Sequence, residues 1–265
     1  MEPLAALAFL ATGALAGLAA GLLGIGGGAV IVPALLVLLP AFGAGGPWTP
    51  HQAVATSLAT VVAAGSASAL SHHRRGAVRW GLVWRLAPGI VMGAGCGALV
   101  AGWLPALWLQ RLFAVFLLLS GMRMLLAAGK PAPTRALPTG RVLTAAGGGI
   151  GALSAVLGIG GGTMLVPYLA RHGVVLRQAV ATSSACGVPL ALVGSLGFVL
   201  SGWGRDGLPA GSLGFVLWPA ALAVAAAAVP LAGVGARLAH RLPTATLKRV
   251  FSVLLLMVGL RLLVT

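Results

Sequence analysis

A glycine-rich segment that occurs twice is the strongest constraint on how this chain can fold. The first copy reads Gly21-Leu-Leu-Gly24-Ile-Gly26-Gly27-Gly28, and the second reads Val156-Leu-Gly158-Ile-Gly160-Gly161-Gly162. The copies lie 134 positions apart, counted from Gly24 to Gly158. A proline follows each at the same spacing, Pro33 and Pro167. Each glycine costs about 1 kcal/mol relative to alanine inside a helix. We therefore expect a broken backbone at both places, with positive φ angles that glycine tolerates.

The composition places these breaks inside a membrane. Of the 265 residues, 59% are hydrophobic and 7% are charged, whereas soluble domains carry about 25% charged residues. Apolar stretches near 20 residues predict a helical bundle rather than a barrel. Broken backbone survives at membrane depth only where protein buries it or where it lines a cavity. Matching broken segments in two halves indicate the binding site of a transporter.

The apolar segments repeat in the same order in two halves. The first half is predicted to contain helical segments at 4–23, 29–39, 51–71, 81–102 and 107–127, and the second at 142–157, 163–170, 178–200, 213–236 and 247–264. The hexapeptide Gln52-Ala-Val-Ala-Thr56-Ser57 returns as Gln178-Ala-Val-Ala-Thr182-Ser183. We divide the chain into a first repeat (1–129), a linker (130–140) and a second repeat (141–265).

The predicted fold is an all-α integral membrane protein of two inverted-topology repeats. Each repeat has a Gly-broken re-entrant hairpin or discontinuous helix, followed by three transmembrane helices. If the glycine elements are hairpins, nearly all loop Lys and Arg residues fall on one side, in 72–80, 128–141, 171–177 and 237–249. The opposite segments, 1–3, 40–50, 103–106 and 201–212, hold only Arg205. Positive residues mark the inner face, so we favour inverted halves in the cell inner (plasma) membrane. Glycine elements that cross fully would give parallel halves with poorer charge sorting.

The glycine breaks are the first candidate site. A helix that begins after such a turn presents unpaired N–H groups and the positive end of its dipole, which suits an anion. The alternative is close helix packing through small residues. The candidate residues are Gly24, Gly26, Gly27, Gly28, Gly158, Gly160, Gly161 and Gly162.

Polar side chains of the repeated hexapeptide form the second candidate. Gln52, Thr56 and Thr60 lie at i, i+4 and i+8 on one helical face. Their counterparts are Gln178, Thr182 and Cys186, and Ser57 and Ser183 lie beside them. In inverted halves the two rows converge on the glycine turns, where hydroxyls could donate to an oxyanion. The alternative is that these hydroxyls bond the carbonyl one turn back or bridge helices. A thiol at Cys186 could contact a sulfur-containing solute, but a buried inert cysteine is commoner.

The scarcity of acidic residues argues against an enzyme. Glu2 and Asp206 are the only two, and both lie outside the predicted spans. No nucleophile–base pair or metal-ligand cluster is present in the sequence, so we expect no catalytic residues, no metal and no cofactor. The net charge of +15 belongs to loops that set orientation. We therefore expect a lipid bilayer rather than nucleic acid as the partner, and leave a homo-oligomer open.

The doubled motif resembles the sulfite exporter TauE/SafE family of membrane permeases. Gly24-Ile-Gly26-Gly27-Gly28 with Pro33, the hexapeptide at 52–57, and their second copies carry the resemblance over nearly the whole chain. It implies transport of small sulfur-containing anions or organosulfonates of the sulfite, thiosulfate and sulfoacetate class. Two alternatives remain open: a passive anion channel, and a membrane partner that delivers sulfur compounds to an enzyme.

Overall fold

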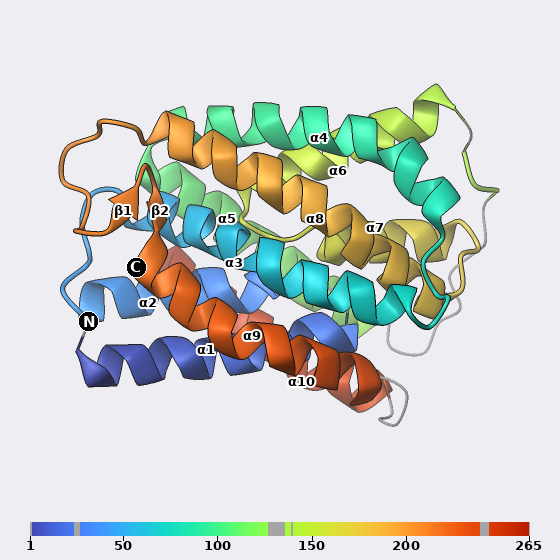
Figure 1. The fold of residues 1–265 in the computed structure, drawn as a ribbon, viewed down its shortest axis with the longest axis horizontal. Coiled ribbons are helices and arrows are strands. Elements are labelled where there is room, and N and C mark those ends of the chain that lie inside the picture. The colour runs from blue at the N-terminus through green and yellow to red at the C-terminus, as the bar shows by residue number, and fades with distance from the viewer. Residues whose placement is uncertain (1, 24–26, 127–135, 139, 239–243, 265) are drawn as a thin grey trace.

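The structure is a computed structural model that describes residues 2–23, 27–126, 136–138, 140–238 and 244–264. Within these residues the chain forms helices and one short antiparallel strand pair (Figure 1). The elements are α1 (Pro3–Leu23), α2 (Gly28–Ala41), α3 (Thr49–His73), α4 (Trp80–Trp103), α5 (Ala106–Leu126), α6 (Arg141–Val156), α7 (Gly162–Arg171), α8 (Leu176–Ser201), β1 (Ser212–Leu213), β2 (Val216–Leu217), α9 (Trp218–Leu238) and α10 (Thr244–Val264). Among the described residues, six helices are long and apolar enough to span a membrane: α1, α3, α4, α5, α8 and α9. The expectation of an all-α membrane protein is confirmed.

The chain reverses direction at each glycine break. The Phe9 ring near the start of α1 packs against the Phe42 ring just past the end of α2, with centroids 6.3 Å apart. α1 and α2 therefore form an antiparallel helical hairpin. α6 and α7 also fold back on one another, and the Ser154 hydroxyl lies 3.9 Å from the Met164 sulfur across their turn (Figure 1). Both glycine elements thus have the hairpin form and do not continue as one helix.

The helix connections gather at two ends of the bundle (Figure 1). One end, here called the hairpin end, carries β1 and β2, the start of α1 and the start of α3. The opposite end, here called the arginine-rich end, carries the described residues Arg74, Arg75, Arg79, Arg141, Arg171, Arg177 and Arg237. Arg205 is the only Lys or Arg among the described loop residues at the hairpin end. The loops therefore group by end as the sequence predicts.

The two halves are interleaved, because the first helix of each half packs against the fourth helix of the other. α1 packs along α9 and α6 packs along α4, with both pairs parallel. A Cβ added to Gly13 or Gly17 would meet backbone of Val224 or Ala228. One added to the counterparts in α6 would meet backbone of α4: Gly147 with Leu86, and Gly151 with Ile90. Small residues let these backbones approach closely, as is usual between membrane helices.

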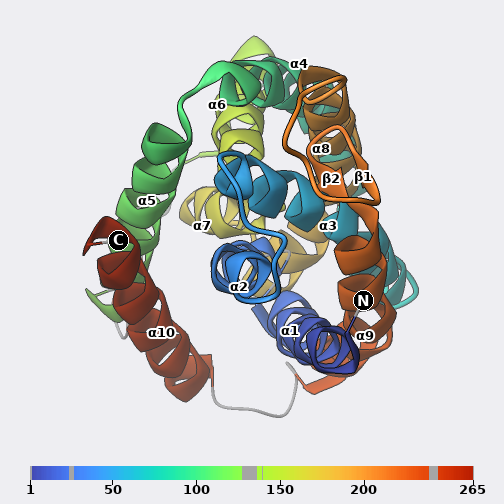
Figure 2. The ribbon, with the colours of Figure 1, turned by 90° about the vertical axis from the view of Figure 1, so that its left-hand side faces the viewer.

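The remaining helix pairs cross between the halves as well. α3 lies antiparallel to α8, with the Ser68 hydroxyl 3.3 Å from that of Ser184. α5 lies antiparallel to α10, where the Gln110 amide donates to the Leu262 carbonyl at 3.2 Å. Figure 2, viewed along the bundle, shows α2, α3 and α7 toward the centre with the other helices around them. The short arms that follow the glycine breaks therefore lie inward of the longer helices, although Pro40 on α2 and Pro167 on α7 remain exposed.

One predicted helix begins later than the sequence indicates. We expected a helix over 213–236, but residues 212–217 form the β1–β2 hairpin and α9 begins at Trp218. Two glycines with positive φ, Gly211 at 85° and Gly214 at 54°, set the turns. The ring of Phe215, which follows Gly214, is fully buried against Phe198 and His51. The burial of this ring against residues of other helices outweighs the tendency of the apolar segment to form a longer helix.

Candidate functional site

Three described glycines of the breaks, Gly27, Gly158 and Gly161, adopt the expected positive φ. Gly27 precedes α2 with φ of 73°, and Gly161 precedes α7 with φ of 39°. Neither helix has a side-chain cap at its N-terminus. Gly28, Gly158, Gly160 and Gly162 are buried with them. Gly24 and Gly26, also predicted for the site, lie outside the described residues. Each arm thus starts inside the protein. The Val30 and Met164 amides bond the Gly27 and Gly161 carbonyls, whereas the Ala29 and Thr163 amides have no backbone partner among the described residues.

The two halves meet at these breaks. The Ser57 hydroxyl on α3 donates to the Gly158 carbonyl of the second break at 2.9 Å. A Cβ built on Gly28, the first residue of α2, would collide with that carbonyl and would lie 3.2 Å from the Ser57 oxygen. The structure therefore brings Gly28, Ser57 and Gly158 together, as the converging rows predict. The absence of a side chain at Gly28 makes this approach possible.

Thr56 and Thr182 have matching tertiary partners. The Thr56 hydroxyl accepts a hydrogen bond from the Leu217 amide at 3.0 Å, and the Thr182 hydroxyl accepts one from the Arg79 amide at 3.1 Å. Leu217 and Arg79 are the residues just before α9 and α4, the fourth helices of the two halves. Each threonine therefore caps a helix of the other half. An accepting hydroxyl keeps its own hydrogen, which remains available to a ligand.

The other predicted residues are divided between packing and the ends of the rows. The Thr60 hydroxyl donates to the Thr56 carbonyl at 2.9 Å, so for this residue the alternative of a bond to the carbonyl one turn back holds. Cys186 is buried on α8. The Gln52 amide reaches the Ser212 hydroxyl at 3.5 Å at the hairpin end, and Gln178 is half-buried near the arginine-rich end.

Two shielded hydroxyls among the described residues have no hydrogen-bond partner, one beside the second break and one a helical turn before Gly187, which packs on Gly160. The Ser183 oxygen on α8 and the Thr163 oxygen in the first turn of α7 are both shielded from solvent and unpaired. Ser183 is the counterpart of Ser57, whose hydroxyl is bonded. Thr163 stands where the first half has Ala29. We did not select Thr163 from the sequence, although aligning the two glycine runs shows a hydroxyl there in the second copy only. A buried hydroxyl without a partner costs free energy, so each needs an explanation.

The hairpin end carries an aromatic cluster that the sequence analysis missed. The His51 ring is fully buried between Trp48 and Phe215, with its Nε2 3.0 Å from the Leu104 carbonyl. The Arg205 guanidinium lies 5.2 Å from the Trp48 ring centroid and 5.7 Å from that of Trp103. These contacts hold the loop before β1 over the end of the bundle. The residues are far apart in sequence, and no local spacing indicates that they meet.

The comparisons with known proteins agree with this architecture. The family model described as sulfite exporter TauE/SafE matches residues 9–262. The chain belongs to the TauE/SafE family. A membrane transporter of this family is not an enzyme, and the resemblance predicted from the doubled glycine motif is confirmed.

Relatives of this TauE/SafE protein carry transporter names. A protein of Haemophilus influenzae named probable membrane transporter protein is 37% identical over 251 residues, which cover 95% of each chain. A Xylella fastidiosa protein of the same name is 30% identical, covering 95% of this chain and 92% of its own. The Bacillus subtilis probable membrane transporter protein YunE is 26% identical, covering 95% and 94%. No solved structure matches the chain. The protein is therefore a multi-pass membrane transporter.

Proposed function

We propose that this transporter carries a small sulfur-containing oxyanion or organosulfonate, and that the anion binds at the second glycine break. The unpaired hydroxyls of Ser183 and Thr163 carry the proposal. A sulfur oxyanion accepts several hydrogen bonds, and two buried donors without partners are matched to it. The family name supports the sulfur chemistry, whereas the names of the relatives specify no substrate.

The start of α7 supplies the rest of the site. The helix begins at Gly162 after a left-handed Gly161, so its N-terminal amides and dipole face the break. Ser57 lies against Gly28 at the start of α2. Ser183 and Gly162 are the counterparts of Ser57 and Gly28 in the second half. By this correspondence, we expect the Ser183 hydroxyl to lie against the start of α7. At the first break Ser57 is already bonded to Gly158 and Ala29 offers no hydroxyl. Among the described residues the two breaks are therefore chemically unequal, because the unpaired hydroxyls belong to the second half.

We also propose that the halves are inverted repeats related by a two-fold axis in the membrane plane. If the two halves change places, the α1–α9 contact becomes the α6–α4 contact. In the same way the Thr56–Leu217 bond becomes the Thr182–Arg79 bond. The antiparallel α3–α8 and α5–α10 pairs are what such an axis requires. By the charge of its loops, the arginine-rich end is the inner face of the cell inner membrane. Cysteines introduced at Gly76 and Gly204 should then react with an impermeant thiol reagent from opposite sides.

Ser183→Ala tests the binding site, with Ser57→Ala as its matched control. Both remove a fully buried hydroxyl at equivalent positions of α8 and α3. Ser183→Ala removes a group without a partner, so the melting temperature without ligand should stay the same or rise, while the thermal shift with sulfite, thiosulfate or a sulfonate should shrink. Ser57→Ala breaks the bond to Gly158. It should therefore lower the free energy of unfolding by about 0.5–1.5 kcal/mol, and the ligand-free melting temperature should fall with it.

The outcomes separate the proposals. A Ser183→Ala protein with normal anion affinity and reduced ligand-free stability would assign Ser183 to packing. If none of these anions shifts the wild-type protein, the substrate class is wrong. If proteoliposomes never accumulate the anion against its own gradient, a passive channel would be favoured.

A further inference from the structure

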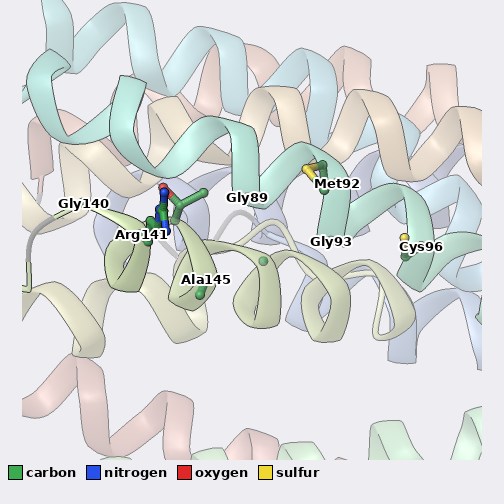
Figure 3. A pocket seen from close by; sticks show the side chains of 9 residues that line it. Gly89, Met92, Gly93, Cys96, Gly140, Arg141 and Ala145 are labelled. Carbon is green, nitrogen blue, oxygen red and sulfur yellow. The ribbon is translucent and has the colours of Figure 1, made fainter.

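A groove lies between α4 and α6 (Figure 3), two helices at the periphery of the bundle (Figure 2), and no residue of the glycine breaks lines it. It has a volume of about 640 Å³ and is lined by Gly89, Met92, Gly93, Cys96, Gly140, Arg141, Thr144, Ala145 and Gly148. This volume lies in the range of small-molecule sites, about 300–1,000 Å³. Met92, Cys96 and Ala145 are exposed along it. In a membrane transporter such a surface faces lipid.

Glycines let α4 and α6 approach closely. They also place no side chains in the space beside the helix contact, so a groove remains there. A Cβ on Gly89 or Gly93 would collide with the carbonyl of Thr144 or Gly148. The Thr144 hydroxyl is already bonded to the Arg85 carbonyl at 3.1 Å. The walls are therefore apolar and have no unpaired side-chain donor along their length. An apolar chain fits there.

The charge is confined to one end. Arg141 is exposed at the start of α6 and lies at the mouth of the groove, toward the arginine-rich end (Figure 3). The N-terminus of α6 begins at the same point, so its first amides and its dipole add to the positive potential. The Thr144 hydroxyl bonds the backbone carbonyl of Arg85, so the backbone of this exposed residue also lies at that end. An anionic group is favoured at this mouth and at no other point of the groove.

The length of the groove matches one leaflet of a bilayer. Gly89 faces Thr144, so Arg141 is level with about Leu86 on α4. The ten helical steps from Leu86 to Cys96 rise about 15 Å, which is half of a hydrocarbon core of about 30 Å. A molecule with a charged head at Arg141 and a tail reaching Cys96 therefore spans a single leaflet.

The equivalent groove between α1 and α9 lacks these features. By the internal repeat, Gly89, Gly93, Thr144 and Arg141 correspond to Ala227, Leu231, Leu10 and Leu7. Larger side chains occupy the flank there, and no guanidinium stands at its mouth. The chain thus contains its own comparison: two helix pairs with matching backbone contacts, of which one has a groove with a cationic end.

We propose that the α4–α6 groove binds one anionic glycerophospholipid of the leaflet at the arginine-rich end, with its phosphate at Arg141 and an acyl chain along Gly93 toward Cys96. A second copy of the chain is the competing occupant, and the test below distinguishes the two. Basic pockets between membrane helices suit anionic headgroups. The site is separate from the proposed anion site, so either can fail without the other.

Native mass spectrometry of the purified full chain with phosphatidylglycerol or phosphatidylethanolamine of identical acyl chains tests this. Wild-type protein should retain one phosphatidylglycerol in preference to phosphatidylethanolamine. Arg141→Gln should lose that preference, with affinity falling roughly five- to tenfold. Arg237→Gln is the control, because Arg237 is exposed at the same end but lies on α9. Ala145→Leu, which fills the groove, should also reduce binding, whereas Ala11→Leu, at the equivalent exposed position of α1, should not.

Cys96 gives an independent readout. It is exposed, and Cys186 is buried, so a lipid-soluble maleimide should modify Cys96 first. Added phosphatidylglycerol should slow this reaction in wild type and not in Arg141→Gln. Equal retention of both lipids, equal effects of Arg141→Gln and Arg237→Gln, or a dimer whose formation protects Cys96 in place of lipid would each overturn the proposal.

Discussion

Replacing Thr56 by valine tests whether its hydroxyl is needed to cap α9. The side chain keeps its branched shape, but the Leu217 amide loses its acceptor. Thr56 is fully buried and Leu217 is 6% exposed, so water cannot readily replace the hydroxyl. An unsatisfied buried donor costs about 1–3 kcal/mol. We expect a loss of that size in the stability of the folded protein.

Thr60→Val is the matched control on the same helix. Thr60 is equally buried, but its hydroxyl only donates to the Thr56 carbonyl, which the α3 ladder already satisfies. Its loss should cost less than about 1 kcal/mol. Thr182→Val should cost less than Thr56→Val, because the bond between Thr182 and the Arg79 amide is only partly buried, whereas the bond between Thr56 and the Leu217 amide is buried.

The assay is the unfolding midpoint of detergent-solubilised protein, followed by tryptophan fluorescence. At roughly 2–4 °C per kcal/mol for a chain of this size, Thr56→Val should melt several degrees below Thr60→Val. Equal midpoints for Thr56→Val and Thr60→Val would refute the capping role. Transport per folded molecule is the second readout: a loss in Thr56→Val or Thr182→Val beyond the loss of folded protein would show that these hydroxyls also serve the substrate.

Three further outcomes follow from the packing. Gly28→Ala should destabilise the protein by about 1–3 kcal/mol, because its Cβ would meet the backbone of Gly158 and Ile159; a normal unfolding midpoint would contradict that contact. Gly81→Ala in α4 has open space around its Cβ and should instead stabilise by up to about 1 kcal/mol, so a lowered midpoint would contradict the open environment. Cysteines at Ser68 and Ser184, whose oxygens lie 3.3 Å apart, should form an α3–α8 disulfide detectable by a mobility shift, and failure to cross-link under oxidation would argue against that helix pairing.

The sequence by itself determined the helices, the glycine breaks and the family. These features depend on short windows: apolar length defines a span, a glycine run opposes a helix, and the hexapeptide at 52–57 is recognisable wherever it stands. The predicted ends of α3 and α8 therefore lie within two residues of the ends in the structure. The β1–β2 hairpin was not predicted, because it depends on the packing of the Phe215 ring against residues on α3 and α8.

Only the tertiary structure decided what each hydroxyl does. In sequence, Ser57 and Ser183 are identical members of a repeat, yet one is bonded to Gly158 and the other has no partner. Thr56 and Thr182 face amides more than 100 residues away, and no spacing encodes that distance. The physical reason is that helix formation is local, whereas the partner of a buried polar group depends on which helices the whole chain packs together. The interleaving of the halves makes those partners, whereas the difference between Ala29 and Thr163 at the two breaks is already present in the sequence.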